Sequence, residues 1–360
     1  MKVALVYDKV NKWGGAERVL LALHEIFPDA PLYTSVYDKK NATWAKAFKI
    51  ITSPLQGISI LRGYNDKLPV FMPIAFESFN FDEYDLVISV TSEAAKGIIT
   101  KPGTLHICYC LTPTRYLWSG YKDYFTNSLF RFISAPAVSY LRQWDKVAAS
   151  RPDYFIAISK EVQDRIKKYY GCDSKIIYPP LMLKSFNGMV KRTKGEYFLL
   201  VSRFSRSSYY KRVDLAIDSF NKTGLSLKIA GSGPMLKGFR KKGKGNIEFL
   251  GELTDSELAY YYENCQALVF PGLEDFGLVM AEAQYFGKPV IAYRAGGALD
   301  IVKTGVTGEF FEKQTVESLS EVLERFNGKR YNKADIIRNS QRFSFENFEL
   351  QLKELIKDKI

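Results

Sequence analysis

Histidine and cysteine are scarce in this chain of 360 residues, which contains two histidines and four cysteines. The cysteines stand singly within apolar stretches, so we expect reduced core residues and no disulfide framework. Cys108 and Cys110 are separated by one residue, but two histidines in the whole chain supply too few further ligands for a zinc site. Reduced cysteines and the lack of a signal peptide at Met1 predict a cytoplasmic protein without bound metal.

Long hydrophobic runs are also missing from the sequence. No apolar stretch approaches the ~20 residues that span a bilayer, so no transmembrane segment is expected. Acidic residues are outnumbered, because the formal net charge is +12 and the excess is shared evenly between the two halves. Such a protein favours anions, among them polyphosphates and acidic lipids. With no dedicated basic arm and no recognised nucleic-acid motif, nucleic acid is not an expected partner.

Hydrophobic residues make up 46% of the chain. That is enough for two cores, since a single core stops growing near ~250–300 residues. The first half alternates short apolar runs with amphipathic helical segments, as in a parallel α/β sheet. The predicted strands are 2–8, 32–37, 86–90, 107–110, 155–158 and 176–178, and the first predicted helix is 16–27.

A polar, basic stretch at 184–194 separates a first lobe, 1–183, from a second lobe, 184–342. The same alternation restarts there, so the second lobe is also predicted to be doubly wound. Its predicted strands are 197–201, 225–230, 247–250, 267–270, 290–293 and 309–311, with helices near 212–222, 254–264 and 278–286. Helical spacing of apolar residues near the chain end predicts a closing helix within 343–360.

The glycines do not spell a dinucleotide fingerprint. Gly231 and Gly233 are followed by Leu236 where that motif needs its third glycine, which disfavours dehydrogenase chemistry. Gly14 and Gly15 stand between the first predicted strand and helix. There they either let backbone N–H groups approach a pyrophosphate or only form a tight turn.

The strongest local signal directly follows a predicted strand and contains Glu274 and Glu282. In a helix that begins nearby, the N–H groups of Phe276, Gly277 and Leu278 would be exposed to a diphosphate. Glu274 could then face a sugar while Glu282 accepts hydrogen bonds from ribose hydroxyls. Alternatively, Glu274 or its neighbour caps the helix and Glu282 is a solvated helix residue.

With this pair the chain resembles the retaining glycosyltransferases of family four, whose signature is a Glu-x7-Glu pair in this setting. The resemblance extends over most of the chain. Segments similar to that family stand in the family's order at 14–17, 116–118, 176–180, 201–203, 210–214, 230–234 and 295–297.

The resemblance implies the GT-B fold, which has two Rossmann-like doubly wound lobes facing a central cleft, with the closing helix crossing back onto the first lobe. The donor nucleotide would bind mainly to the second lobe. Arg203 and Lys211 would contact its diphosphate, a role that a guanidinium fork and an ammonium group suit. Glu282 would hold the ribose, Glu274 would approach the transferred sugar, and Gly231 would belong to the donor pocket.

The resemblance also implies a retaining transfer from a nucleoside-diphosphate sugar without a cofactor. The chain has no Asp-x-Asp pair, the metal-clamp signature of the other large glycosyltransferase architecture, so no metal is expected. Basic residues and helix-terminal amides would instead neutralise the charge on the leaving diphosphate. The segment 112–118 is similar to mannosyltransferases that build surface polysaccharides, which favours GDP-mannose as donor and a lipid-linked saccharide or glycan as acceptor.

Leu111 departs from the family pattern, in which a histidine commonly stands there and contacts the donor sugar near its sixth carbon. Either the donor lacks a hydroxyl at that carbon, or another group such as Thr112 contacts it. A third alternative is that Leu111 points into the core while a neighbouring loop supplies the contact.

Two other functions are compatible with the sequence. A nucleotide-sugar epimerase could share the fold, although two histidines leave few acid–base candidates. An inactive binder of sugar nucleotides or nucleic acid could use the positive charge. Aromatic and basic residues between Trp44 and Phe76 suit docking on an anionic membrane, which predicts peripheral association with the inner face of the plasma membrane.

Overall fold

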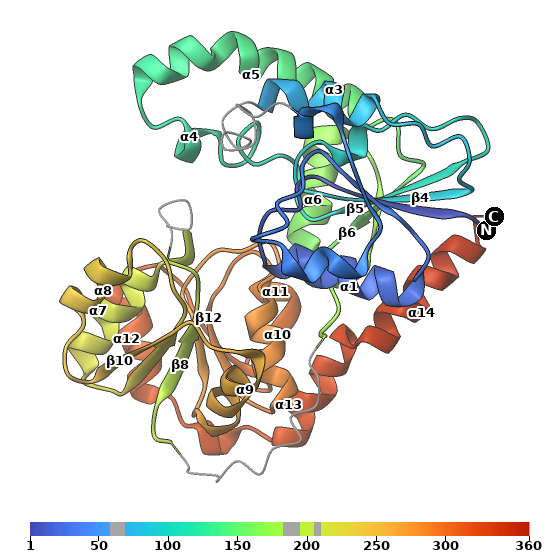
Figure 1. Ribbon diagram of the computed structural model, residues 1–360. Helices are drawn as coiled ribbons and strands as arrows, with labels where there is room; N and C mark the ends of the chain where they lie inside the picture. Colours follow the sequence, from blue (N-terminus) through green and yellow to red (C-terminus); the bar gives the residue numbers. More distant parts are fainter. Residues whose placement is uncertain (58–68, 183–194, 205–209, 360) are drawn as a thin grey trace. The chain divides into compact units, whose positions relative to one another are not determined.

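The computed structural model describes residues 1–57, 69–182, 195–204 and 210–359 (Figure 1). The chain divides into two compact units, one formed by Met1–Pro180 and Phe348–Ile360 and the other by Leu181–Asn347. The second unit begins slightly before the predicted boundary because the Leu181 N–H donates to the Phe343 carbonyl at 2.7 Å. The polar stretch at 184–194 lies outside the described residues.

The first unit contains seven parallel strands in the order β3-β2-β1-β4-β5-β6-β7. The strands are β1 (Val3–Tyr7), β2 (Leu32–Thr34), β3 (Ile50–Thr52), β4 (Leu86–Thr91), β5 (Leu105–Cys110), β6 (Tyr154–Ala157) and β7 (Ser174–Ile176). All six residues of β4 are buried, as expected for a central parallel strand covered on both faces.

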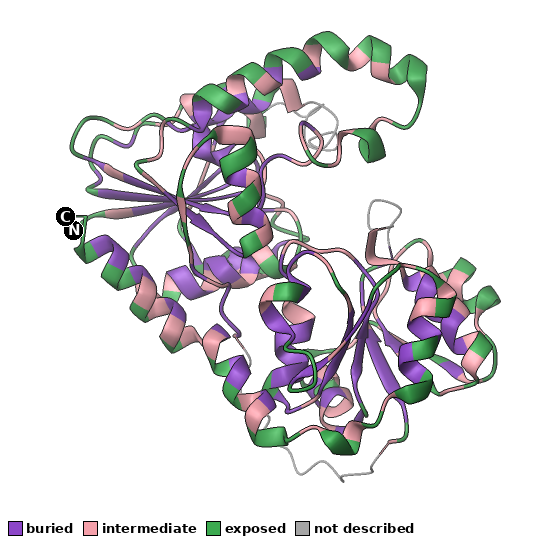
Figure 2. Cartoon of the chain, turned by 180° about the vertical axis from the view of Figure 1, so that it is seen from behind, coloured by how far each residue is buried: buried purple, intermediate pink, exposed green. Residues whose placement is uncertain are grey.

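Helices cover the sheet of the first unit, and Figure 2 shows its strands as largely buried between them. The helices are α1 (Gly15–Ile26), α3 (Met72–Glu77), α4 (Tyr121–Tyr124), α5 (Ser128–Ala148), α6 (Lys160–Tyr170) and α14 (Phe345–Lys357). From Phe348 onward α14 belongs to this unit, where Phe348 packs edge-on against Tyr109 with ring centroids 5.9 Å apart. Within the described residues, no helix combines the length and apolarity needed to cross a bilayer.

The second unit has six parallel strands in the order β10-β9-β8-β11-β12-β13, the order of a Rossmann sheet. The strands are β8 (Phe198–Val201), β9 (Leu227–Ala230), β10 (Ile247–Gly251), β11 (Leu268–Phe270), β12 (Val290–Tyr293) and β13 (Gly308–Phe311). Its helices are α7 (Val213–Thr223), α8 (Leu236–Lys242), α9 (Asp255–Asn264), α10 (Leu278–Tyr285), α11 (Ala298–Ile301), α12 (Val316–Arg325) and α13 (Lys333–Ser340).

The prediction of two doubly wound α/β lobes is confirmed by these sheets. The four cysteines are free, and three of them are buried, as expected for reduced core residues. The short edge strand β3 was not predicted, because its three residues are only partly buried and form no distinct apolar run.

Candidate functional site

The sheet of the second unit changes winding direction between β8 and β11, which are spatial neighbours although two strands separate them along the chain. In open parallel sheets, ligands bind beyond the carboxyl ends of the strands at such a point. Arg203 follows β8, Glu274 follows β11 and Gly231 follows β9. The fold therefore brings these three predicted positions to the sheet edge where a ligand is expected.

Lys211 and Glu274 form an ion pair in the second unit, with 2.5 Å between Lys211 Nζ and Glu274 Oε1. The two side chains are 15% and 20% exposed, so the pair is partly desolvated but open to solvent. The backbone holds it in place, because the Leu273 N–H donates to the Tyr210 carbonyl at 3.1 Å. Two residues predicted to act on the same ligand, 63 positions apart in the chain, thus lie side by side.

Gly272 makes this close approach possible. A Cβ atom at position 272 would lie 2.8 Å from Lys211 Cα and 3.1 Å from the Tyr210 carbonyl oxygen. Carbon atoms in ordinary contact are ~3.5–4.0 Å apart. Any side chain at 272 would therefore push the loop that carries Glu274 away from Lys211.

Arg212 has a strained backbone directly beside the ion pair. Its φ of 51° is the only positive φ of a non-glycine residue within the described part of the chain. The left-handed conformation costs roughly 1–2 kcal/mol for such a residue, and strain of this kind clusters at functional sites. Arg212 is the N-cap residue of α7, so the turn that begins this helix also places Lys211. Arginine does not favour this conformation, so nothing in the sequence predicts it.

The loop between β11 and α10 ends in a glycine N-cap. Gly277 has a φ of 89° and no side chain caps the helix, so the alternative in which Glu274 or Asp275 is the cap is wrong. The Glu274 carbonyl instead accepts the Gly297 N–H at 2.9 Å, which ties this loop to the turn after β12. Because the first N–H groups of a helix have no carbonyl partner within it, the start of α10 favours an anion.

The other predicted residues of this segment differ in exposure. Phe276 is 3% exposed and packs edge-on against Phe343 at 5.4 Å between ring centroids, so its side chain belongs to the core. Leu278, the first residue of α10, is partly exposed. These two residues can therefore offer a ligand their backbone more readily than their side chains.

Glu282 lies within α10 and is only 2% exposed, so the alternative that it is a solvated helix residue is wrong. Its Oε2 accepts a hydrogen bond from the Tyr262 hydroxyl at 2.9 Å. Tyr262 comes from α9 and stacks on Phe286 with ring centroids 5.5 Å apart. Sequence reasoning did not find Tyr262, because the contact joins two helices and no motif links them.

Arg203 and Gly231 lie at the ends of the neighbouring strands β8 and β9. Arg203 is exposed and forms no ion pair with the described residues. At Gly231, where φ is 136°, a Cβ atom would lie 1.8 Å from the Ser202 carbonyl oxygen, so only glycine fits. The Gly231 N–H donates to the Gly251 carbonyl at 2.7 Å. Gly231 therefore shapes the sheet edge, while its N–H is already engaged within the protein.

The sheet of the first unit also changes direction, between β1 and β4, and Asp8 and Glu93 follow these strands. The Asp8 carboxylate is buried and accepts the four successive backbone N–H groups from Ser92 to Ala95 at 2.7 to 3.0 Å. Lys9 Nζ lies 3.0 Å from Glu93 Oε2. This polar cluster was not predicted, although an aspartate at the end of the first strand is a usable signal.

The three predicted residues of the first unit follow β1 and β5. Gly14 is the N-cap residue of α1 with an extended backbone, and Gly15 is the exposed first residue of that helix. Leu111 directly follows β5, and its N–H donates to the Thr91 carbonyl at 2.8 Å. Leu111 is only half-buried, which disfavours the alternative that it belongs to the core.

A buried ion pair joins α5 to the turn after β4. Lys96 Nζ lies 2.5 Å from Asp145 Oδ1, and both side chains are 1% exposed. Burial alone would lower the pKa of Lys96, but the Asp145 carboxylate raises it above its ordinary value. Asp145 also accepts hydrogen bonds from the hydroxyl of Thr114 and the indole of Trp118. These two residues of the family-like segment 112–118 thus anchor the fold of the first unit.

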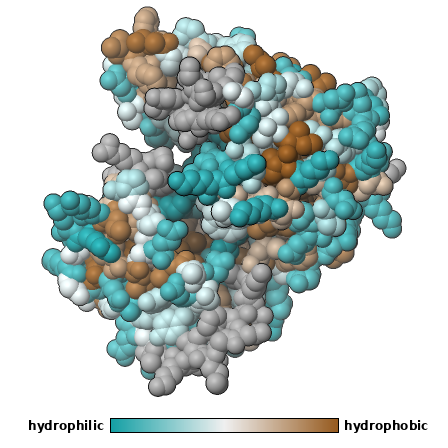
Figure 3. All heavy atoms as spheres, in the orientation of Figure 1, coloured by the Kyte–Doolittle hydropathy of each residue, from teal (hydrophilic) through white to brown (hydrophobic). Residues whose placement is uncertain are grey.

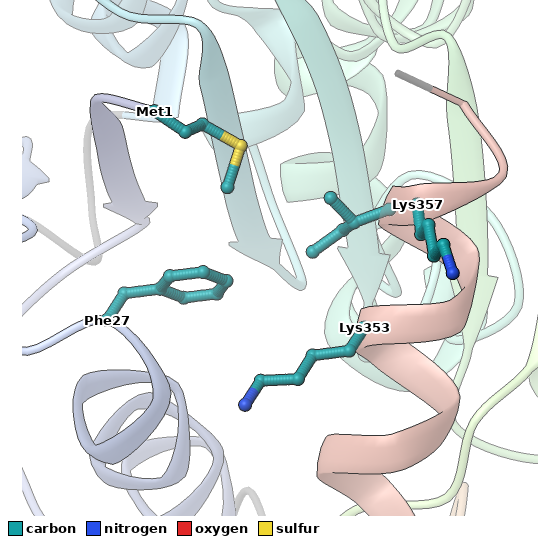
Figure 4. A pocket seen from close by; sticks show the side chains of 5 residues that line it. Met1, Phe27, Lys353 and Lys357 are labelled. Carbon is teal, nitrogen blue, oxygen red and sulfur yellow. The ribbon is translucent and has the colours of Figure 1, made fainter.

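A hollow of about 480 Å³ lies within the first unit (Figure 4). It is lined by Met1, Phe27, Lys353, Ile356 and Lys357. No carboxylate or imidazole lines it, so it is not a candidate active site. Within the described ranges, no group of three or more His, Cys, Asp and Glu side chains could hold a metal ion. The expectation that no metal is needed stays a prediction.

Comparison with known proteins places this site in context. Residues 184–343, which include Arg203, Lys211, Glu274 and Glu282, match the family model described as glycosyl transferases group 1. An uncharacterized glycosyltransferase of Methanocaldococcus jannaschii is 30% identical over 211 residues, which are 56% of this chain and 58% of that protein. The O-antigen chain mannosyltransferase C of Escherichia coli is 27% identical over 201 residues, 51% of each chain. The chain spans about half the length of the curated relatives it matches first.

Solved structures agree on the fold. HepE of Anabaena in complex with UDP-glucose has a TM-score of 0.73 at 18% identity, with 99% of this chain and 100% of that chain covered. The fold is GT-B, as predicted. Together, the family match and the mannosyltransferase relatives support a glycosyltransferase.

Proposed function

We propose that this protein is a retaining glycosyltransferase that moves a sugar from a nucleoside-diphosphate sugar, GDP-mannose in the first place, to a lipid-linked saccharide or glycan. The observation that carries the proposal is the Lys211–Glu274 ion pair at the switch point of the second unit. It joins a cation suited to a diphosphate with a carboxylate suited to sugar hydroxyls, next to the N-terminus of α10.

In the proposed reaction, Lys211 and Arg203 bind the donor diphosphate. The Lys211 ammonium has three N–H donors, so it can keep Glu274 and still bind phosphate oxygens. As the bond between the sugar and the diphosphate breaks, negative charge grows on the leaving oxygen. Lys211, Arg203 and the amides at the start of α10 stabilise that charge without a metal ion.

Without a covalent glycosyl-enzyme intermediate, retention requires the acceptor hydroxyl to attack the anomeric carbon from the face that the diphosphate leaves. The new glycosidic bond forms as the sugar–phosphate bond breaks, and the hydroxyl proton passes to an oxygen of the leaving diphosphate. Glu274 accepts a hydrogen bond from the transferred sugar and thereby orients it. Glu282, held by Tyr262, is the candidate partner of the ribose.

The epimerase alternative needs an acid and a base beside the sugar. His106 is fully buried and shares a hydrogen bond with the Ser89 hydroxyl, and His24 packs against Phe48. Both histidines belong to the first unit, His24 in the last turn of α1 and His106 within β5, so neither stands directly after a switch-point strand. Their placement favours group transfer over epimerisation.

The relatives favour mannose as the transferred sugar but do not identify the base of the donor nucleotide. Mannosyltransferases occur among the sequence relatives, including a GDP-mannose-dependent enzyme of Corynebacterium glutamicum that is 32% identical over 127 residues, 34% of this chain and 30% of that protein. HepE, with the same fold, binds UDP-glucose. The relatives that act on O-antigen chains also favour a glycan acceptor, and we propose peripheral association with an anionic membrane as the way such an acceptor is reached.

A thermal-shift screen tests the proposal, with GDP-mannose, UDP-glucose, UDP-galactose and the free diphosphates GDP and UDP, each with Mg²⁺ and with EDTA. We expect GDP-mannose and GDP to raise the unfolding temperature equally in Mg²⁺ and in EDTA. Labelled mannose should then pass to a lipid-linked saccharide, and no free-sugar interconversion should occur without acceptor. A stabilisation only by uridine donors would overturn the choice of GDP-mannose. Stabilisation by no sugar nucleotide would overturn the proposal itself.

A further inference from the structure

Helix α5 has apolar residues on two opposite faces. On its inner face, Val138, Leu141 and Ala148 are buried. The apolar residues of its outer face are Leu129, Phe132, Ile133, Pro136, Tyr140 and Val147, and each lies three, four or seven residues from another member of the set. Such spacing places residues on one stripe of a helix. We call this set the outer stripe of α5.

The outer stripe is strongly exposed. Phe132 is 81% exposed, Leu129 and Ile133 are each 66% exposed, and Val147 is 58% exposed. Figure 3 shows hydrophobic atoms gathered at the upper left, where α5 begins in Figure 1. A surface helix normally turns polar residues outward, and clustered exposed apolar residues mark interaction sites.

The solvent-accessible charges on α5 have one sign, because its one carboxylate, Asp145, is buried and paired with Lys96. From residue 124 to residue 144 the sequence contains no aspartate or glutamate, but it contains Arg131 and Arg142. Arg131 donates to the Phe125 carbonyl, and Arg142 donates to the Leu117 carbonyl at 2.7 Å. Carbonyls leave both positive charges in place, and neither arginine pairs with a carboxylate of a described residue. Lys146 adds a further exposed cation near the end of the helix.

We propose that the outer stripe of α5 is the surface by which this protein docks on an anionic lipid bilayer. The helix would lie in the plane of the interface, with the outer stripe among the acyl chains and the flanking cations at anionic headgroups. A stripe of apolar residues whose accessible neighbouring charges on α5 are all cations fits this chemistry better than a self-complementary contact. Two copies of such a surface would bring like charges together.

This inference rests on the proposed function only for the reason that docking would be useful, since a membrane would present a lipid-linked acceptor to the enzyme. The segment 44–76, predicted for this role, also contains exposed apolar residues, Phe71 and Ile74. Phe48 and Phe76 are buried in the core of the first unit, and residues 58–68 lie outside the described residues. Apolar residues at helical spacing occur both on a face that packs into the core and on a face exposed to a membrane. The sequence therefore did not identify α5 as a docking helix.

Co-sedimentation of the full chain with vesicles tests the docking surface. The vesicles contain phosphatidylcholine alone or with 30% phosphatidylglycerol, about a third of the lipid as anionic headgroups. The test variant combines Leu129→Ser and Phe132→Ser, two strongly exposed positions. The matched control is Leu350→Ser, because Leu350 is 57% exposed on another helix, α14.

We expect wild type to bind the anionic vesicles at low salt and to release them as salt rises. The double variant should bind more than tenfold more weakly, and Leu350→Ser should bind as wild type. Equal binding by the double variant would overturn the proposal. Another outcome would also overturn the proposal. If wild type is a dimer that binds no vesicles, and the double variant is a monomer, then a second copy of the chain covers the outer stripe. Stabilisation by the sugar nucleotide should be equal in all variants, so failure of docking is distinguishable from failure of the proposed function.

Discussion

Replacing Gly272 by alanine would separate the two residues that the proposed mechanism uses together. The added Cβ would meet Lys211 Cα at 2.8 Å and the Tyr210 carbonyl oxygen at 3.1 Å. Both obstacles are backbone atoms, so no flexible side chain can move aside. The loop that carries Glu274 must shift instead.

The size of that shift follows from the contact distance. A carbon–carbon contact of ~3.5–4.0 Å requires a separation about 0.7 to 1.2 Å larger than the glycine structure allows. A misplacement of about 1 Å at a catalytic group can lower the rate by about 10²-fold. Overpacking of this kind costs about 1–3 kcal/mol of folding free energy. Gly272→Ala should therefore stay folded but lose most of its turnover.

The assay is sugar transfer under saturating donor, with urea unfolding measured in parallel. Gly238→Ala is the matched control, because a Cβ at Gly238 in α8 would meet nothing within 4 Å. The control should keep wild-type turnover and gain about 0.5–1 kcal/mol of stability, as expected for Gly→Ala within a helix. A Gly272→Ala protein that is destabilised but turns over at the wild-type rate would refute the idea that the Lys211–Glu274 geometry matters for transfer.

Three further predictions test other parts of the structure. Glu274→Gln should lower turnover much more than donor affinity, because its contact is with the reacting sugar, and wild-type turnover measured in this variant would contradict that role. Leu111→His should shift donor preference from a 6-deoxy sugar toward its C6-hydroxylated counterpart, since an unpaired buried hydroxyl costs ~1–3 kcal/mol. Competition between the two donors measures this preference. An unchanged ratio of the two products would show that position 111 does not contact C6. Burial lowers the pKa of His106 to about 3 from an ordinary 6.5. Between pH 6.5 and pH 3, only the unfolded chain binds a proton at this imidazole. Lowering the pH from 7 to 5 should therefore reduce the free energy of unfolding by about 2 kcal/mol through His106. Urea unfolding at both pH values should show a smaller loss in His106→Gln, and an equal loss would contradict the assignment.

Periodicity predicted most of the fold because central strands of a parallel sheet are continuous apolar runs. The run at 86–90 corresponds to β4, whose residues are all buried. Residues Ile50–Thr52 pair with β2 at the sheet edge, where each residue is only partly buried and leaves no such run. Edge strands of this kind depend on a neighbour that the local sequence does not reveal.

The candidate site could be predicted only as separate residues. Glu274 was identified from its place after a predicted strand and Lys211 through the resemblance, but their pairing depends on β8 and β11 being adjacent in the sheet. Tyr262 and Arg212 were missed for related reasons. The first contacts Glu282 from another helix, and the second is defined by its backbone conformation rather than by its residue type.

The central claim is that the second unit binds a donor diphosphate through Lys211 and Arg203. Titration calorimetry with the sugar nucleotide that gives the largest thermal shift tests it in wild type, Lys211→Ala and Arg203→Ala, with Lys241→Ala as a control. Lys241 is an exposed lysine of α8 in the same unit. Loss of a charged hydrogen bond worth ~1.5–3 kcal/mol should raise Kd about 10-fold to 150-fold in Lys211→Ala and Arg203→Ala, while Lys241→Ala stays within twofold. Wild-type affinity in both Lys211→Ala and Arg203→Ala would contradict the claim.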